Sequence, residues 1–356
     1  MTDAVPPTSD LSRAKKLGFA SITVLVALSS FEGAARLLSP PPDAAIHIEH
    51  ENMITVLGLP SLNATMEYDP TLFWKLRDGL DAQLVEGDVL GQPMSFRVST
   101  LDSLRSAPIR SSAPGLRVLA LGDSCTFGLG VDDSATWPAQ LQGMLESQGV
   151  DAEVINAGVP GYTAFQGLRW LETQGLALKP DVLVVIFGFN DRDFWSSRSD
   201  IDTARTLERL PWQVVAEHSR LYTGLRQLLR SRNGARKTSA AAQAESQKSA
   251  EDVVPRLAPD EFQKVLHAIA QRAADADIKL VFATWPYRAQ AEKQVRHTIL
   301  YQTLLEAVAG QTDTKLVDLV GPFVDGGLPL FIDHVHASVE GNRVAAQALL
   351  PAVFGD

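Results

Sequence analysis

The feature that most constrains the fold is a run of apolar residues, DVLVVIFG, at residues 181–188. A strand with one face in solvent alternates polar and apolar residues, whereas this run is apolar almost throughout. We therefore predict a strand that is buried on both faces, as in the centre of a parallel sheet.

Similar runs recur along the chain and alternate with helical patterns. Further strands are predicted at 116–121, 152–157, 278–285 and 315–319. Helices are predicted at 137–149, 165–176, 260–276, 295–310 and after His336. Strands that alternate with helices indicate a parallel sheet with helices on both faces. The predicted fold class is thus α/β, a three-layer α/β/α sandwich.

The N-terminal segment has a different pattern. A basic segment, 13–16, precedes an apolar stretch, 17–38, whose charged residues are Glu32 and Arg36. A positive flank before an apolar core is typical of a signal peptide or a signal anchor. Because the core shows no convincing small-x-small cleavage site, we expect an uncleaved transmembrane anchor. A cleaved signal and an ordinary buried helix stay open as alternatives. By the positive-inside rule, residues 1–16 would be cytoplasmic and the rest of the chain beyond the stretch extracytoplasmic.

The remaining chain divides by composition. Residues 39–114 alternate turn signals with short apolar pieces and are predicted to be a linker and a small N-terminal elaboration. Residues 115–356 are predicted to form the main domain, with 192–258 as an insertion that has no clear strand. Within the insertion, 212–230 has an amphipathic helical pattern, and 231–252 is polar enough to be a mobile loop. The net charge of −10 argues against nucleic acid as a partner.

Small and polar residues follow the predicted strands, at the sheet edge where open parallel sheets bind ligands. The segments are GDSCTFG at 122–128, NAGVPGYT at 156–163, GFND at 188–191 and, before the last helix, DHVH at 333–336. We expect all four to gather at one edge of the sheet.

These segments hold a set of residues suited to nucleophilic catalysis. Ser124 needs a base, and His336 is the best candidate, with Asp333 three residues earlier to hold its imidazole. An oxyanion would need N–H donors, which the Ser124 main chain, Gly161 and the Asn190 amide could supply. Alone, such a serine is usually a helix N-cap and such a glycine a turn residue. Their joint order and placement carry the hypothesis.

Several assignments stay open from the residues alone. Gly158 is an alternative oxyanion glycine, His334 an alternative base and Cys125 an alternative nucleophile. Asp123 and Asp191 raise the question of a metal, but no His or Cys cluster joins them at ligand spacing, so neither metal nor cofactor is expected. The glycine spacing does not fit the G-x-S-x-G elbow of α/β-hydrolases.

Aromatic residues could line a sugar site near the same edge of the sheet. The candidate substrate-lining residues are Trp195, Trp285, Tyr287 and, at the rim, His334. Packing in the core explains such aromatic residues equally well.

The chain resembles the SGNH (GDSL-type) hydrolase family at Ser124, Gly161, Asn190 and His336, with Asp333 as the acid in DHVH. The resemblance covers roughly 116–354 and favours Gly161 and His336 over their alternatives. It implies a flavodoxin-like fold and cleavage of carboxylic esters, often acetyl esters on carbohydrate. The stretch YDPTLFWKL, followed by FRV and the serine segment, resembles a membrane-anchored bacterial branch of the family.

The expected function is therefore a serine esterase that hydrolyses carboxylic esters, with O-acetyl groups on an extracytoplasmic glycan as the favoured substrate. One alternative is an acyl transferase that passes the same acyl group to a hydroxyl of an exported polysaccharide. Another is a non-catalytic carbohydrate-binding or assembly protein that keeps the fold. The expected partners are an acylated small molecule or glycan and, through the anchor, the inner membrane.

Overall fold

The computed structural model of the chain describes residues 13–38, 60–89, 92–192, 199–209, 219, 254–296 and 299–355. The chain divides into two units, Met1–Pro42 with Leu210–Ala242 and Asp43–Arg209 with Gln243–Asp356.

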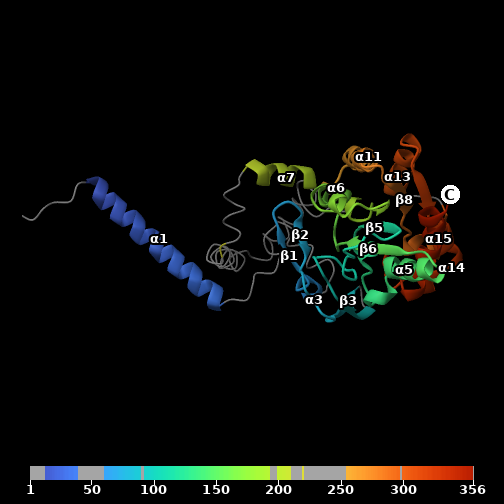
Figure 1. Cartoon of the computed structure of the whole chain (residues 1–356), viewed down its shortest axis with the longest axis horizontal. Coiled ribbons are helices and arrows are strands. Elements are labelled where there is room, and N and C mark those ends of the chain that lie inside the picture. Colours follow the sequence, from blue (N-terminus) through green and yellow to red (C-terminus); the bar gives the residue numbers. More distant parts are fainter. Residues whose placement is uncertain are drawn as a thin grey trace, which may run out of the picture. The chain divides into compact units, whose positions relative to one another are not determined.

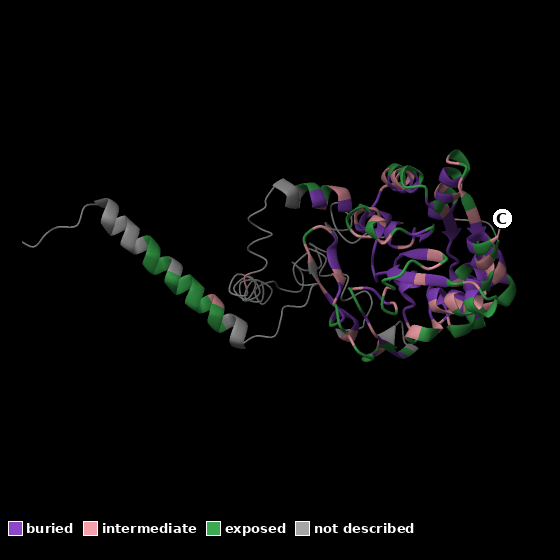
Figure 2. Cartoon of the chain, viewed as in Figure 1, coloured by how far each residue is buried: buried purple, intermediate pink, exposed green. Residues whose placement is uncertain are grey.

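In the first unit, helix α1 (Arg13–Leu38) covers the apolar stretch of the sequence. Ile22, Val24, Val26 and other apolar side chains in its described part are exposed (Figure 2). Among the residues that the structure describes, no helix combines the length and apolar character needed to cross a membrane. The predicted transmembrane anchor over 17–38 is thus not confirmed.

The second unit is built on a five-stranded parallel sheet with the strand order β6-β5-β7-β8-β9. The strands are β5 (Leu116–Gly122), β6 (Ala152–Gly158), β7 (Val182–Ile186), β8 (Lys279–Thr284) and β9 (Lys315–Asp318). The predicted α/β class with a parallel sheet is confirmed. The run DVLVVIFG contains β7, which is the central strand and is buried along its whole length.

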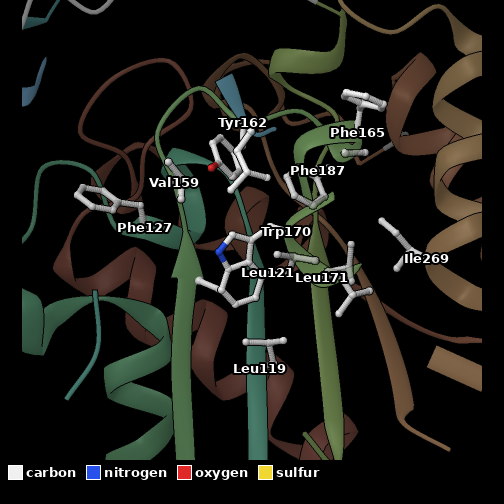
Figure 3. Packing of buried hydrophobic residues seen from close by; sticks show 14 of the residues in the cluster. Leu119, Leu121, Phe127, Val159, Tyr162, Phe165, Trp170, Leu171, Phe187 and Ile269 are labelled. Carbon is white, nitrogen blue, oxygen red and sulfur yellow. The ribbon is translucent and has the colours of Figure 1, made fainter. Parts of the chain in front are cut away.

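Helices cover both faces of this sheet (Figure 1). The first face carries α6 (Ala164–Thr173), α11 (Pro259–Asp275) and α13 (Leu300–Gln311). The second face carries α5 (Trp137–Ser147), α14 (Val320–Gly326) and α15 (Val339–Phe354). Alternate residues of β7 point to opposite faces, because Leu183 belongs to the core of the first face and Val184 to that of the second. Figure 3 shows the first core, with Leu121 of β5 beside Trp170 and Leu171 of α6.

The segment before the sheet forms two small antiparallel strand pairs that the sequence analysis did not predict. After α3 (Pro60–Asn63), β1 (Met66–Asp69) pairs with β2 (Phe73–Leu76), and β3 (Gln83–Val89) pairs with β4 (Gln92–Val98). Buried side chains of α3 and of these strands join the core of the first face: Leu62, Met66, Phe73, Trp74, Leu76, Val85, Met94, Phe96 and Val98. Much of the predicted linker and elaboration is therefore part of the main core.

Shorter elements complete the described fold. They are α4 (Ser124–Phe127), α7 (Asp200–Arg209), α12 (Arg288–Glu292) and four 3₁₀ turns, Asp133–Ala135, Gly175–Leu178, Asn190–Arg192 and Leu328–Leu330. Of the predicted insertion 192–258, the structure describes Arg192, 199–209, Ser219 and 254–258. Apart from Ser219, the amphipathic segment 212–230 and the polar segment 231–252 lie outside the described residues.

Candidate active site

The serine segment is a tight turn between β5 and α4. Asp123 caps the helix, because its Oδ1 accepts a hydrogen bond from the Cys125 N–H at 2.8 Å. Ser124 is therefore the first residue of the helix, directly beyond the carboxyl end of β5. Gly122 must lack a side chain here, since a Cβ would lie 2.2 Å from Thr126 Oγ1 and 2.8 Å from the Ile186 carbonyl oxygen.

The structure brings Ser124, His336 and Asp333 together in one chain of hydrogen bonds. The Ser124 Oγ lies 2.8 Å from His336 Nε2, and His336 Nδ1 lies 2.6 Å from Asp333 Oδ2. With Nδ1–H donated to the carboxylate, Nε2 accepts from the serine hydroxyl. This is the arrangement by which an imidazole can take a proton from a serine.

The loop of Asp333 fixes the histidine from several directions. Asp333 Oδ1 accepts from the main-chain N–H groups of Val335 and His336 at 2.9 and 2.7 Å. The Ile332 N–H donates to the His336 carbonyl at 2.8 Å. Burial alone would raise the pKa of Asp333, but the nearby His336 and the hydrogen bonds from His336 and Val335 hold that pKa well below its ordinary value. Asp333 is therefore ionised at the pH values at which a protonated His336 needs an anionic partner.

Gly161 lies in the loop between β6 and α6 and adopts φ +79°, a conformation that favours glycine. No acceptor among the described residues takes a hydrogen bond from its N–H, whereas the Gly158 N–H donates to Asn156 Oδ1 at 2.9 Å. Gly158 instead packs against the serine turn, where a Cβ would lie 2.1 Å from the Phe127 nitrogen. Of the two candidate glycines, Gly161 is the one whose N–H is available to a ligand.

Asn190 lies beyond the end of β7, where its side chain crosses to the serine turn. Its Nδ2 donates to Asp123 Oδ2 and to the Tyr162 carbonyl oxygen, both at 3.0 Å. The amide thereby joins three of the four predicted segments. Both of its N–H groups have protein acceptors in this structure, so an incoming oxyanion would compete with them.

The sequence pattern of the GDSL-like lipase/acylhydrolase family matches residues 120–344, more than half of the chain. The chain belongs to this family. Membership places the protein among the carboxylic ester hydrolases, and the match spans every segment of the site just described.

The chain is similar to two further proteins. The esterase TesA of Pseudomonas aeruginosa is 36% identical over 83 residues, which are 23% of this chain and 41% of TesA. The match therefore spans less than half the length of that relative. Among solved structures, the acetylxylan esterase Axe2 of Geobacillus stearothermophilus has 19% identity and a TM-score of 0.45, covering 68% of this chain and 96% of Axe2. The crystal structure of TesA has 21% identity and a TM-score of 0.42, covering 67% and 98%.

Cys125 and His334, the alternative nucleophile and base, lie outside the hydrogen-bonded chain of Ser124, His336 and Asp333. Cys125 is buried with its Sγ toward the Val335 carbonyl, and burial together with the nearby Asp123 raises the pKa of its thiol well above the ordinary value. His334 has its side chain about half exposed and its Nδ1 3.9 Å from Asp333, while the imidazole that reaches Ser124 is that of His336. Burial lowers the pKa of His334.

The predicted substrate-lining aromatics differ in their surroundings. Trp285 is buried, donates from Nε1 to the Val335 carbonyl at 2.8 Å and packs on Phe323, so its contacts are those of a core residue. Tyr287 lies with its ring centroid 5.6 Å from that of Phe189. Trp195 lies outside the described residues.

The rim next to His336 contains an aromatic cluster with a cation. The His334 ring lies 5.3 Å from the Phe189 ring and 6.3 Å from the His336 ring. Arg192 places its guanidinium 4.9 Å from the centroid of Phe189 and 4.8 Å from that of Tyr287. The sequence analysis missed Phe189 and Arg192. Phe189 is part of GFND and Arg192 is the next residue, so the expected position of GFND at the sheet edge was a signal for both.

The two aspartates that raised the question of a metal are structural acceptors. Asp191 is fully buried and accepts from the main-chain N–H groups of Ala164 and Gly188, both at 2.8 Å. Burial raises the pKa of Asp191 to about 7 and that of Asp123 to about 6. Within the part of the chain that the structure describes, no three His, Cys, Asp or Glu side chains group as a metal site.

Three further residues that the sequence analysis did not single out surround the Gly161 loop. Trp74 Nε1 donates to the Pro160 carbonyl at 3.0 Å, and Arg256 donates from Nη1 to the Gly161 carbonyl. Arg256 also forms a fully buried ion pair with Asp200, at 2.7 Å. No local sequence pattern marks these contacts, because each joins residues that are far apart in the chain.

Proposed function

We propose that the protein hydrolyses carboxylic esters through an acyl-enzyme on Ser124. The observation that carries this proposal is the unbroken hydrogen-bonded chain from Ser124 through His336 to Asp333 at the carboxyl edge of the sheet. Family membership supports it independently.

In this mechanism the Ser124 Oγ attacks the ester carbonyl carbon while His336 Nε2 takes the hydroxyl proton. The tetrahedral intermediate then collapses, the bond to the alcohol oxygen breaks, and His336 returns the proton to the leaving alcohol. Water attacks the acyl-enzyme with the same base, which releases the carboxylic acid and restores the serine. Asp333 holds the imidazole in the productive tautomer and stabilises its charged form.

Stabilisation of the oxyanion is assigned to the main-chain N–H groups of Ser124 and Gly161 and to the Asn190 amide. The availability of the Gly161 N–H supports its assignment. For Asn190, we propose that the oxyanion replaces the Tyr162 carbonyl as an acceptor, while the bond to Asp123 keeps the amide aligned.

We propose an O-acylated glycan, with acetyl as the acyl group, as the substrate. The half-exposed ring of His334, which packs on Phe189 and lies 6.3 Å from the His336 ring, supports this choice, because a flat ring beside the proposed base suits the face of a sugar ring.

We further propose that the catalytic unit lies outside the inner membrane, with residues 1–16 cytoplasmic and 17–38 as the anchor. The basic flank and the apolar stretch of the sequence support this topology. In intact cells, a protease added outside should cleave the catalytic unit and spare a tag on the N-terminus. Recovery of the full chain as a free cytoplasmic protein would contradict the topology.

The decisive experiment measures acetate release from acetylated glycans by the full chain and by Ser124→Ala. We expect turnover by the wild type and loss of essentially all of it in the variant, with Ser147→Ala, an exposed serine of α5, as the control. Transfer of acetate to an added polysaccharide instead of to water would show the acyl transferase. Failure of wild-type Ser124 to react with a fluorophosphonate would favour a non-catalytic protein.

A further inference from the structure

The peptide bond between Pro160 and Gly161 carries the N–H group proposed as an oxyanion donor. Its carbonyl oxygen, that of Pro160, accepts a hydrogen bond from the indole Nε1 of Trp74 at 3.0 Å. Trp74 belongs to β2, is 2% exposed and lies outside the residues that match the family pattern. A side chain of the N-terminal segment therefore holds the opposite end of the same peptide group.

We propose that Trp74 is a positioning residue of the oxyanion hole, which makes the N-terminal strand pair a working part of the active site. This inference rests on the proposed function, since it concerns how the Gly161 N–H is aimed during ester hydrolysis.

The first physical reason is the planarity of the peptide group. Its carbonyl and N–H point in opposite directions in one plane, so a bond that fixes the Pro160 oxygen also fixes the direction of the Gly161 N–H. Gly161 adopts φ +79° and has no side chain to restrain it, so the loop needs an outside contact to hold one orientation.

The second reason is polarisation. Donation to a peptide carbonyl withdraws charge from the amide and makes its N–H a stronger donor, because hydrogen bonds in a chain reinforce one another. An N–H held in place before the reaction also needs no reorganisation when the oxyanion forms. Trp74 would thus act on the transition state more than on the bound ester.

The structure holds Trp74 itself from the loop that it supports. Tyr162 donates its hydroxyl to the Trp74 carbonyl at 2.6 Å, and the two rings meet edge to face at 5.9 Å. The loop and β2 are therefore joined by reciprocal hydrogen bonds, one from each side chain to the other segment's main chain.

The next peptide group is restrained in the same way from the other side. Arg256 donates to the Gly161 carbonyl and lies with its guanidinium 5.5 Å from the Trp74 ring centroid. The buried Asp200 fixes the orientation of that guanidinium through Nε and Nη2, at 3.1 and 2.7 Å. Both peptide groups that flank Gly161 are thus held by their carbonyl oxygens.

The test compares Trp74→Phe with Trp137→Phe in the full chain. Both tryptophans are buried, but the Trp137 Nε1 has no partner among the described residues, so its replacement removes a similar volume and no hydrogen bond. For Trp74→Phe we expect kcat to fall about 10- to 100-fold with KM within about twofold. Binding of a boronic acid, which forms a tetrahedral adduct with the serine, should weaken by the same factor as kcat.

A second variant separates alignment from folding. Incorporation of 3-benzothienylalanine at position 74 keeps the bicyclic shape and removes only the N–H donor, and it should reproduce the loss of kcat. An unchanged kcat in this variant, or equal losses in Trp74→Phe and Trp137→Phe, would overturn the role of Trp74 while leaving the esterase intact. A wild-type chain that cleaves no ester would instead overturn the proposed function and this inference with it.

Discussion

Asp123 is the residue on which the polar contacts of the serine turn converge. It caps α4 through Cys125 and accepts from Asn190, so it joins the turn of Ser124 to the proposed oxyanion donor Asn190. Burial raises the pKa of Asp123 to about 6, although the Cys125 N–H and His336 oppose the rise. The folded chain therefore keeps a proton on this carboxyl over a range in which an unfolded aspartate has lost it.

This shift predicts a pH dependence of stability. Between about pH 4 and pH 6 the folded state binds more protons at Asp123 than the unfolded state does, so its contribution is fully present below pH 4 and is lost as the pH rises through about 6. The wild type should lose stability relative to Asp123→Asn over this range, as measured by urea unfolding at each pH. A constant difference between the two proteins would contradict the raised pKa.

Asn190 gives a second prediction at the residue scale. Because its amide donor is proposed to act on the oxyanion, Asn190→Ala should lower kcat on the order of 10²–10³-fold. Binding of an uncleavable substrate analogue should change little, since the donor acts on the transition state. Equal losses in turnover and in analogue binding would make Asn190 a structural residue.

Two glycines make opposite predictions at the scale of the element. Gly143 lies exposed in α5, where an added Cβ would meet no atom within 4 Å, so Gly143→Ala should stabilise the fold by about 0.5–1 kcal/mol and leave kcat unchanged.

Gly158→Ala would force β6 away from the serine turn, because the new Cβ meets main-chain atoms of Thr126 and Phe127. It should cost about 1–3 kcal/mol and lower kcat, as thermal unfolding and initial rates would show.

The strands and helices of the main sheet could be predicted from sequence, because their apolar residues form clear local patterns. The short N-terminal strands could not, because they depend on contacts with residues far away in the chain. The strands β5 to β9 are marked by apolar runs and the helices α5, α6, α11, α13 and α15 by helical patterns of apolar residues, and the structure has each of them. β1 and β2 are only four residues long, too short for a period to emerge. They are stabilised by pairing with each other and by burial against the main core.

The same distinction holds for the site. Ser124 and Asn190 follow from the rule that functional residues collect beyond strand ends, Asp333 and His336 come from the segment before the last helix, and the structure brings all four together. Trp74 and Arg256 act by donating to main-chain carbonyls 86 and 95 residues away along the chain. A main-chain carbonyl has no sequence signature, so such contacts become visible only in three dimensions.

At the scale of the whole molecule, the N-terminal strand pairs predict where the catalytic unit can be cut. A fragment that starts at residue 43 keeps β1 to β4 and should fold and retain the kcat of the full chain. A fragment that starts at residue 115 lacks Trp74 and the buried side chains of that region, and it should unfold at lower temperature and lose activity. Equal activity of the two fragments would show that the family's matched region suffices alone.

The distance along the chain between the proposed nucleophile and the proposed base has a consequence for biosynthesis. His336 follows Ser124 by 212 residues, so a ribosome that adds about 5–20 residues per second needs on the order of 10–40 s to reach it. Until then the serine hydroxyl has no imidazole to take its proton. Under the proposed mechanism, a nascent chain therefore has no ester hydrolysis through Ser124 before His336 has been added.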